Sequence, residues 1–141
     1  MQRIREYGHD IIQTNNYQKQ KDFIQHGHVS VYEHALNVTT MCLKIADCLP
    51  VQVNERALVR GALLHDYFLY DWHEPGHGLH GFKHPRIALN NANQDYHLNK
   101  IEKDMIVKHM FPLTLNLPRY KESYILVLAD KIVAISETLH R

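Results

Sequence analysis

Residues 61–72 read GALLHDYFLYDW and set His65 and Asp66 side by side in an otherwise apolar stretch. The apolar residues predict a buried segment, and a buried imidazole or carboxylate needs a hydrogen-bonding or charged partner. Both residue types are also common metal ligands. We therefore expect the rest of the chain to supply partners for this doublet.

Length and composition predict one folded domain in a reducing compartment. The 141 residues are enough for a core of their own, and the formal net charge of +1 gives no signal for nucleic-acid binding. The charged start, MQRIREYGHDII, lacks the apolar region of a signal peptide, and no apolar run approaches membrane-spanning length. Two cysteines are too few for a disulfide framework. These features predict a cytoplasmic protein without a membrane partner.

Helical periodicity surrounds the doublet on both sides. Ser30 and Glu33 form a capping-box pattern at the start of a helix over 30–49, and an apolar stripe along this helix runs beside His34. Asn54 is placed to cap a second helix that continues to about residue 69. Successive helical residues point about 100° apart, so His65 and its neighbour can enter one pocket from two sides of a turn.

A glycine-rich segment follows the doublet. Residues 71–83, DWHEPGHGLHGFK, contain three glycines and a proline and predict an ordered loop. Its histidines are His73, His77 and His80. His80 is close enough to the next helix to face a site there, whereas the other two suit the protein surface. Pro85 is expected at the first position of that helix, which places His84 at its N-cap.

Two further helices complete the pattern. Asn99 and Glu102 form another capping-box pattern, and the helix they begin carries His109 on an apolar column. Residues 122–139 contain the nearly unbroken apolar run ILVLADKIVAI, which predicts the central core helix with Asp130 in its middle.

The whole pattern predicts an all-α fold, a compact single-domain helical bundle of five to seven helices. We expect one domain over 1–141 with its core at about 28–135. Residues 1–27 are expected to form an N-terminal extension with one or two short helices.

Six ionisable side chains fall on predicted core or cap positions: His34, His65, Asp66, His84, His109 and Asp130. Each alone has a simpler interpretation, because a buried histidine is usually a hydrogen-bonded core residue and a buried aspartate can accept from a tyrosine or an arginine. Six in one small domain are exceptional, since such groups are rarely buried without partners. Metal coordination would replace their lost solvation, and the sequence therefore predicts a metal centre.

In its order of residues, H…HD…H…H…D, the chain resembles the HD-domain superfamily of metal-dependent phosphohydrolases over about residues 28–135. The resemblance implies a helical bundle and two divalent transition-metal ions, drawn from Fe, Mn, Co, Ni or Zn. It implies that His34, His65, Asp66 and Asp130 hold the first ion. It further implies that Asp66 bridges to a second ion held by His84 and His109.

The resemblance also implies an enzyme. Its expected reaction is hydrolysis of a phosphate ester or anhydride bond in a nucleotide or another small phosphorylated metabolite, through metal-activated hydroxide. Asp66 would be catalytic. Lys131, beside Asp130, and Arg86, in the expected first turn of a helix, could bind phosphate, although each also suits a solvated charge.

Some family signatures are absent. The Gly-Lys that follows the doublet in many members is replaced here, where residues 67–70 read YFLY. The paired histidines and the GYP motif of cyclic-dinucleotide phosphodiesterases are missing too, since Met110 follows His109. The resemblance therefore implies no cyclic-dinucleotide substrate.

Two other functions remain open at this point. Mixed-valent di-iron oxygenases of small organic substrates resemble this chain in the same ligand order, so ligands alone do not separate oxygenation from hydrolysis. A catalytically silent HD module that binds a ligand or partner is the third possibility. The complete ligand set argues against it, because a silent domain has no need of a costly site.

Overall fold

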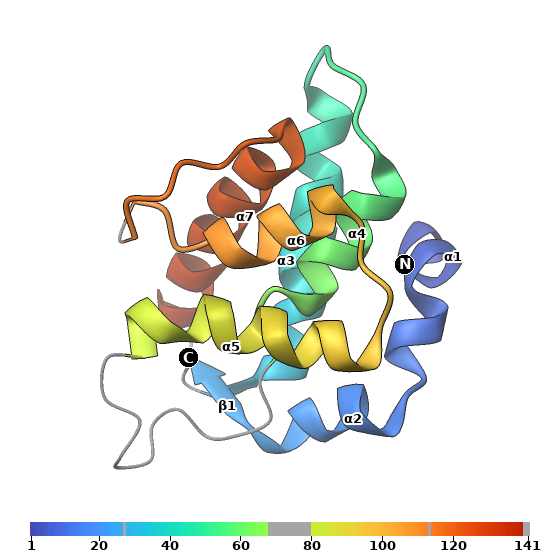
Figure 1. Cartoon of the computed structure of the whole chain (residues 1–141), viewed down its shortest axis with the longest axis vertical. Coiled ribbons are helices and arrows are strands. Elements are labelled where there is room, and N and C mark those ends of the chain that lie inside the picture. Colours follow the sequence, from blue (N-terminus) through green and yellow to red (C-terminus); the bar gives the residue numbers. More distant parts are fainter. Residues whose placement is uncertain (27, 68–79, 113, 140–141) are drawn as a thin grey trace.

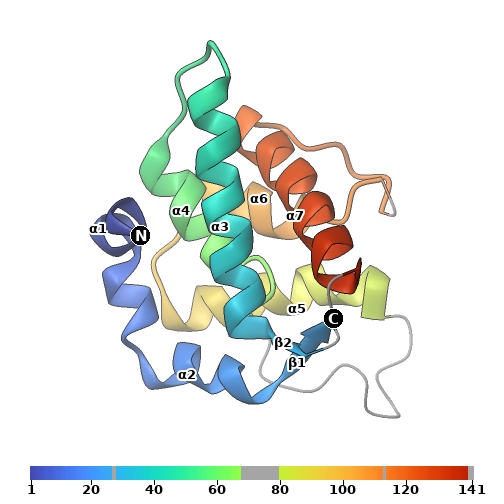
Figure 2. The same ribbon diagram turned by 180° about the vertical axis from the view of Figure 1, so that it is seen from behind.

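Helices make up nearly all the regular structure in the computed structural model, which describes residues 1–26, 28–67, 80–112 and 114–139 (Figures 1 and 2). Within these ranges the side chains of residues 24–26 and 80–84 are not described. The seven described α-helices are α1 (Gln2–Ile12), α2 (Asn15–Gln18), α3 (Val31–Cys48), α4 (Glu55–Leu64), α5 (His80–Asp95), α6 (Lys100–Lys108) and α7 (Lys121–Leu139). A 3₁₀ turn, Lys19–Asp22, and the antiparallel strands β1 (Ile24–His26) and β2 (Val29–Ser30) separate α2 from α3. The predicted all-α fold is confirmed.

Helix α4 is the centre of the bundle. All eight residues from Ala57 to Leu64 are buried, and α4 packs against α1, α3, α5, α6 and α7. Gly61 allows α6 to approach closely, because a Cβ atom at this position would lie 2.5 Å from the Sδ of Met105. A side chain on every face of α4 therefore contributes to the core.

The expectation that residues 122–139 form the central core helix is wrong, because α4 occupies the centre of the bundle. Helix α7 buries one face, with Ile125, Leu126, Ala129 and Val133, but leaves large apolar residues exposed on the opposite face. The apolar run in the sequence predicts a buried helix, yet other elements cover only one side of it.

Three helices begin where their caps predict. The hydroxyl of Ser30 accepts the N–H of Glu33 at 3.1 Å, and the side chain of Asn54 caps α4. Asn99 and Glu102 form a complete capping box, with each side chain accepting the backbone N–H of the other. These starts were predictable because a cap is decided by residues within one turn.

Two predicted boundaries around the doublet are wrong. Helix α4 ends at Leu64 instead of near residue 69, and His65 is its C-cap, with its N–H directed to the carbonyl of Ala62. The doublet therefore lies in the turn after the helix, where the backbone leaves the α4 axis and turns toward α6 and α7. Residues 68–79 lie outside the described residues.

Helix α5 begins at His80, so the last residues of the predicted loop are helical and Pro85 lies inside the helix. Pro85 has no N–H, and the helix loses one internal hydrogen bond there. The proline is buried, so its ring contributes apolar contact in exchange. As a result Arg86 lies in the second turn of α5, away from the N–H groups of the first turn that favour anions, and it is exposed.

Strands β1 and β2 were not predicted, because segments of three and two residues are too short for an alternating pattern to be recognised. No helix within the described ranges has the length and apolar character needed to cross a membrane.

Asp104 ties α6 to the start of α7 and gives a pH-dependent prediction. Its Oδ2 accepts the Arg119 N–H at 2.9 Å and the Ser123 hydroxyl at 2.6 Å, and its Oδ1 lies 2.8 Å from the Lys108 ammonium. Burial alone raises the pKa of Asp104, but the bonds from Lys108, Ser123 and Arg119 outweigh it and lower the pKa. The carboxylate therefore stabilises the fold above about pH 4, the pKa of an unfolded aspartate, and this contribution is lost as pH falls through the lowered pKa.

We expect Asp104→Asn to lower the free energy of unfolding by about 1–3 kcal/mol at pH 7. The difference from the original protein should shrink below pH 4. Urea unfolding at pH 7 and pH 3 measures both. Asp47→Asn is the control, since Asp47 pairs with Arg3 on the exposed surface and should change stability by less than about 1 kcal/mol. An undiminished difference at pH 3 would contradict the role of the ionised carboxylate.

Candidate metal centre

Four helices bring a group of histidines and aspartates together in the core. His34 comes from α3, the His65–Asp66 doublet from the turn after α4, and Asp130 from α7. One ligand atom from each of these four residues lies within 4.8 Å of every other. His109, the C-cap of α6, joins them, with its Nε2 3.3 Å from the Oδ1 of Asp66. The three imidazoles are at most 1% exposed.

The two aspartates lie between the imidazoles. Asp130 Oδ1 is 2.9 Å from the Nε2 of His34 and 3.3 Å from the Nε2 of His65. Asp66 Oδ2 is 3.3 Å from the Nε2 of His65 and 3.7 Å from that of His34. The other oxygen of Asp66, Oδ1, faces His109. The two oxygens of this one carboxylate therefore face different sides of the group.

The backbone at two helix ends fixes the orientation of two imidazoles. The Nδ1 of His65 is 2.6 Å from the Ala62 carbonyl, and the Nδ1 of His109 is 2.7 Å from the Ile106 carbonyl. A carbonyl oxygen only accepts, so in both rings Nδ1 carries the hydrogen. In the neutral ring the lone pair is then on Nε2, which points at the carboxylates. Both carbonyls lie in the last turn of their helices, and the Ala62 carbonyl also receives the backbone N–H of His65.

Glu137 also contacts the group and was not predicted from the sequence. Its Oε1 lies 2.7 Å from the Nδ1 of His34, and its Oε2 accepts the side-chain amide of Asn37 at 2.9 Å. Glu137 is two turns along α7 from Asp130 and is buried on the same face. A glutamate seven residues after the buried aspartate, in a helix this apolar, was the available signal. His34 is thus held by a carboxylate, where the other two imidazoles are held by carbonyls.

The group favours positive charge at its centre. Burial lowers the pKa of His34, but hydrogen bonds with Asp130 and Glu137 outweigh it and raise that pKa to about 9. Burial likewise opposes ionisation of His65, yet attraction to the carboxylates of Asp66 and Asp130 raises its pKa. Burial raises the pKa of Asp130, but the hydrogen bond with His34 and attraction to the imidazole of His65 outweigh it and lower the pKa.

This chemistry suits a cation. The Nε2 of His65 makes no hydrogen bond with the described residues, although two carboxylate oxygens lie 3.3 Å away. The imidazole nitrogens and carboxylate oxygens that converge here form a mixed nitrogen and oxygen donor set, which divalent transition metals prefer. The buried group of His34, His65, Asp66 and Asp130 could therefore bind a metal ion.

The remaining predicted site residues either lie away from the core group or have side chains that the structure does not describe. The side chain of His84 is not described, nor is that of His80, and His73 and His77 lie outside the described residues. The ammonium of Lys131 donates to the carbonyl of Phe111 at 2.6 Å, from an exposed position.

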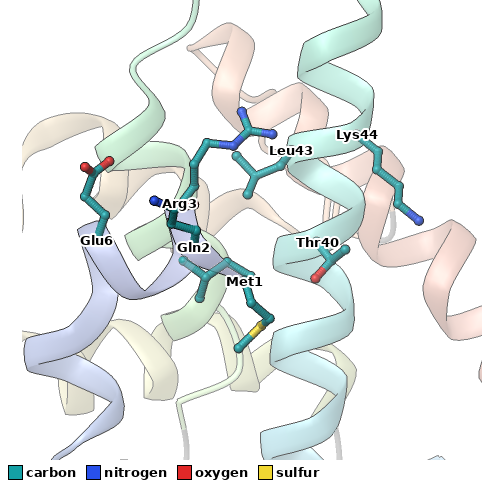
Figure 3. A pocket seen from close by; sticks show the side chains of 8 residues that line it. Met1, Gln2, Arg3, Glu6, Thr40, Leu43 and Lys44 are labelled. Carbon is teal, nitrogen blue, oxygen red and sulfur yellow. The ribbon is translucent and has the colours of Figure 1, made fainter.

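A cavity of about 410 Å³ lies between the start of α1 and the middle of α3 (Figure 3). Its lining residues are Met1, Gln2, Arg3, Ile4, Glu6, Thr40, Leu43 and Lys44. None of them belongs to the histidine and aspartate group, and the guanidinium of Arg3 is bound to Asp47. This cavity is therefore separate from the core group.

Comparisons of the chain with protein-family models, with curated proteins and with solved structures give no match.

Proposed function

We propose that the chain is a metal-dependent phosphohydrolase that acts on a nucleotide or another small phosphorylated metabolite, and that its core group is the catalytic metal centre. One observation carries the proposal. Three buried imidazoles direct Nε2 toward the buried carboxylate of Asp66 and the largely buried carboxylate of Asp130, at separations of 2.9–3.7 Å. The order of these residues along the chain, and their helical setting, support membership of the HD-domain superfamily.

In this proposal His34, His65, Asp66 and Asp130 hold one ion. The position of Asp66, with one oxygen toward His65 and the other toward His109, supports a second ion that shares this carboxylate. His84 would complete the second set. The ions would supply Lewis acidity toward a phosphoryl oxygen and would lower the pKa of a water molecule.

The chain's own residues have defined tasks here. The carboxylates of Asp66 and Asp130 would supply the negative charge that holds the cations in the centre of the bundle. The carbonyls of Ala62 and Ile106 keep two imidazoles in the tautomer that presents Nε2. Because these donor atoms are already held in place, little ordering would oppose the binding of an ion.

Metal content and two activity assays test the proposal. Protein reconstituted anaerobically with Mn²⁺, Co²⁺ or Fe²⁺ should bind close to two ions per chain by elemental analysis. Under the same anaerobic conditions it should release phosphate from nucleotides. It should also release nitrophenol from p-nitrophenyl phosphate or bis-p-nitrophenyl phosphate. Oxygen consumption by the ferrous protein with organic substrates, in the absence of any phosphatase activity, would favour the oxygenase alternative. No bound metal after reconstitution would contradict the metal centre itself.

Glu137 gives a graded prediction. Glu137→Ala removes the acceptor for the His34 Nδ1 hydrogen, and loss of such an outer partner typically weakens metal affinity about 10–100-fold. Glu137→Gln keeps an amide oxygen that can accept this hydrogen, so its loss should be smaller. Competition with a chelating dye measures the affinities. Glu6→Ala, at an exposed position on α1, is the control. Equal affinity in all four proteins would show that Glu137 does not support His34.

A further inference from the structure

The turn that carries the His65–Asp66 doublet is tied to α5 by the residue that follows it. Tyr67 is fully buried, and its hydroxyl donates to the Oδ2 of Asp95 at 2.6 Å. Its backbone carbonyl accepts the side-chain amide of Asn91 at 3.1 Å. Asn91 and Asp95 are four residues apart on α5, so both lie on the same face of that helix. We call Tyr67, Asn91 and Asp95 the Tyr67 clamp.

The ring of Tyr67 is packed against two other aromatic rings. The ring of Tyr17 stacks on it with a centroid distance of 6.1 Å, and that of Tyr96 meets it edge-on at 5.5 Å. The hydroxyl of Tyr17 donates to the Leu63 carbonyl at 2.7 Å, near the end of α4. Close packing of this kind restricts the Tyr67 side chain to the position from which it reaches Asp95.

The backbone beside Asp66 is restrained at the same place. The N–H of Tyr67 donates to the Leu64 carbonyl at 3.1 Å. This N–H belongs to the peptide unit that follows Asp66, and the carbonyl that Asn91 binds belongs to the next unit. Hydrogen bonds therefore restrain the chain on both sides of Tyr67, and with it the direction in which the Asp66 side chain leaves the backbone.

Asp66 requires a defined direction because its two oxygens have different neighbours. Oδ2 lies 3.3 Å from the Nε2 of His65, and Oδ1 lies 3.3 Å from the Nε2 of His109. A rotation of the turn would move an oxygen away from its imidazole. A buried tyrosine hydroxyl needs a partner whatever its role, but that need does not account for the bond from Asn91 to the backbone of the turn.

We propose that the Tyr67 clamp holds the Asp66 carboxylate in position between His65 and His109, which makes Tyr67 a positioning residue. In its effect on metal binding this inference rests on the proposed function, whereas the ordering of the turn by α5 does not depend on a bound ion. Helix α5 crosses the lower part of the bundle in both views (Figures 1 and 2) and also contains His84. The clamp therefore joins the doublet to the helix that would complete the second set of ligands.

Competition with a chelating dye for Co²⁺ tests the effect on metal binding. Tyr67→Phe keeps the ring but removes the hydroxyl, and it is expected to weaken metal affinity about 10–100-fold, as loss of an outer partner typically does. Asp95→Ala should give a loss of the same size, and the double variant should lose no more, because both changes break the same bond. Asp95→Asn should retain most of the affinity, since its amide oxygen can accept the same hydroxyl hydrogen.

Tyr96→Phe is the matched control, because it removes another tyrosine hydroxyl, just after the end of α5. That hydroxyl bonds Thr14 and lies 3.5 Å from the Tyr67 hydroxyl, a weak contact beside the 2.6 Å bond to Asp95. The control should lose stability to a similar extent in urea unfolding but keep its metal affinity within about threefold. Unchanged affinity in Tyr67→Phe, or equal affinity losses in the two variants, would overturn the proposal.

Amide hydrogen exchange of the metal-free proteins separates this proposal from the proposed function. The readout is the N–H of residue 67, which is bonded to the Leu64 carbonyl. Its exchange should be at least about tenfold faster in Tyr67→Phe than in the original protein, and unchanged in Tyr96→Phe. If the original protein bound no metal but Tyr67→Phe showed this acceleration, the metal centre would be contradicted and the clamp retained. Unchanged exchange in Tyr67→Phe would overturn the clamp, whether or not the protein binds metal.

Discussion

Asp66→Ala is expected to leave the purified protein with almost no bound metal and to lower its phosphatase kcat/KM by about 1,000-fold or more. The physical reason lies in the position of this carboxylate. One oxygen is 3.3 Å from His65 Nε2 and the other is 3.3 Å from His109 Nε2, so a single substitution removes a donor from both sides of the group. The charge of Asp66 would also attract the cations, and its loss would leave Asp130 as the remaining carboxylate among the four residues proposed to hold the first ion.

Elemental analysis and phosphate release on the same preparations measure this effect. Asp22→Ala, an exposed aspartate near the start of the chain, is the control and should retain metal and activity. His109→Ala separates the two sides of the centre. It should lose the second ion while it keeps part of the first, because the Nε2 of His109 faces Oδ1 of Asp66, whereas Oδ2 faces His34 and His65. Equal loss of both ions would indicate a mononuclear site or strong cooperativity, and unchanged metal in Asp66→Ala would remove Asp66 from the centre.

The features that the sequence predicted correctly depend on short stretches of chain. Capping residues Ser30, Asn54 and Asn99 begin their helices as expected, because each cap acts on an N–H within the same turn. The burial of His34 and His109 followed from their helical register against apolar neighbours. Their encounter was predictable for a different reason. Several buried ionisable groups in one small core have to satisfy one another.

The features that were missed depend on the packing of distant elements. An apolar sequence continues beyond Leu64, yet α4 ends there, and the turn brings the doublet to α6 and α7. The helix propensity of the residues around Leu64 does not predict that turn. The exposed side of α7 was missed because apolar residues occur on all faces of this helix. Its own sequence does not show which face other elements will cover. Glu137 was missed because its partner His34 is 103 residues away.

Removal of metal by a chelator is expected to lower the melting temperature by about 10–15 °C. A ligand present at about 1,000 times its dissociation constant stabilises the folded state by about 4 kcal/mol. For a chain of this size, each kcal/mol shifts the melting temperature by about 3–4 °C. The ligand atoms come from α3, the turn after α4, and α7, so an ion joins elements that are far apart in sequence. Its binding free energy therefore adds directly to the stability of the whole bundle.

Differential scanning calorimetry with and without EDTA measures the shift, and two variants show where it arises. Asp66→Ala should melt at nearly the same temperature in both conditions, because it holds no metal to remove. Asp104→Asn should melt lower than the original protein but keep the full EDTA shift, since Asp104 binds Ser123 and the Arg119 N–H, apart from the metal group. If EDTA left the original protein unchanged, the buried imidazoles and carboxylates would have to stabilise one another without an ion. An equal EDTA shift in Asp66→Ala would place the metal at another site.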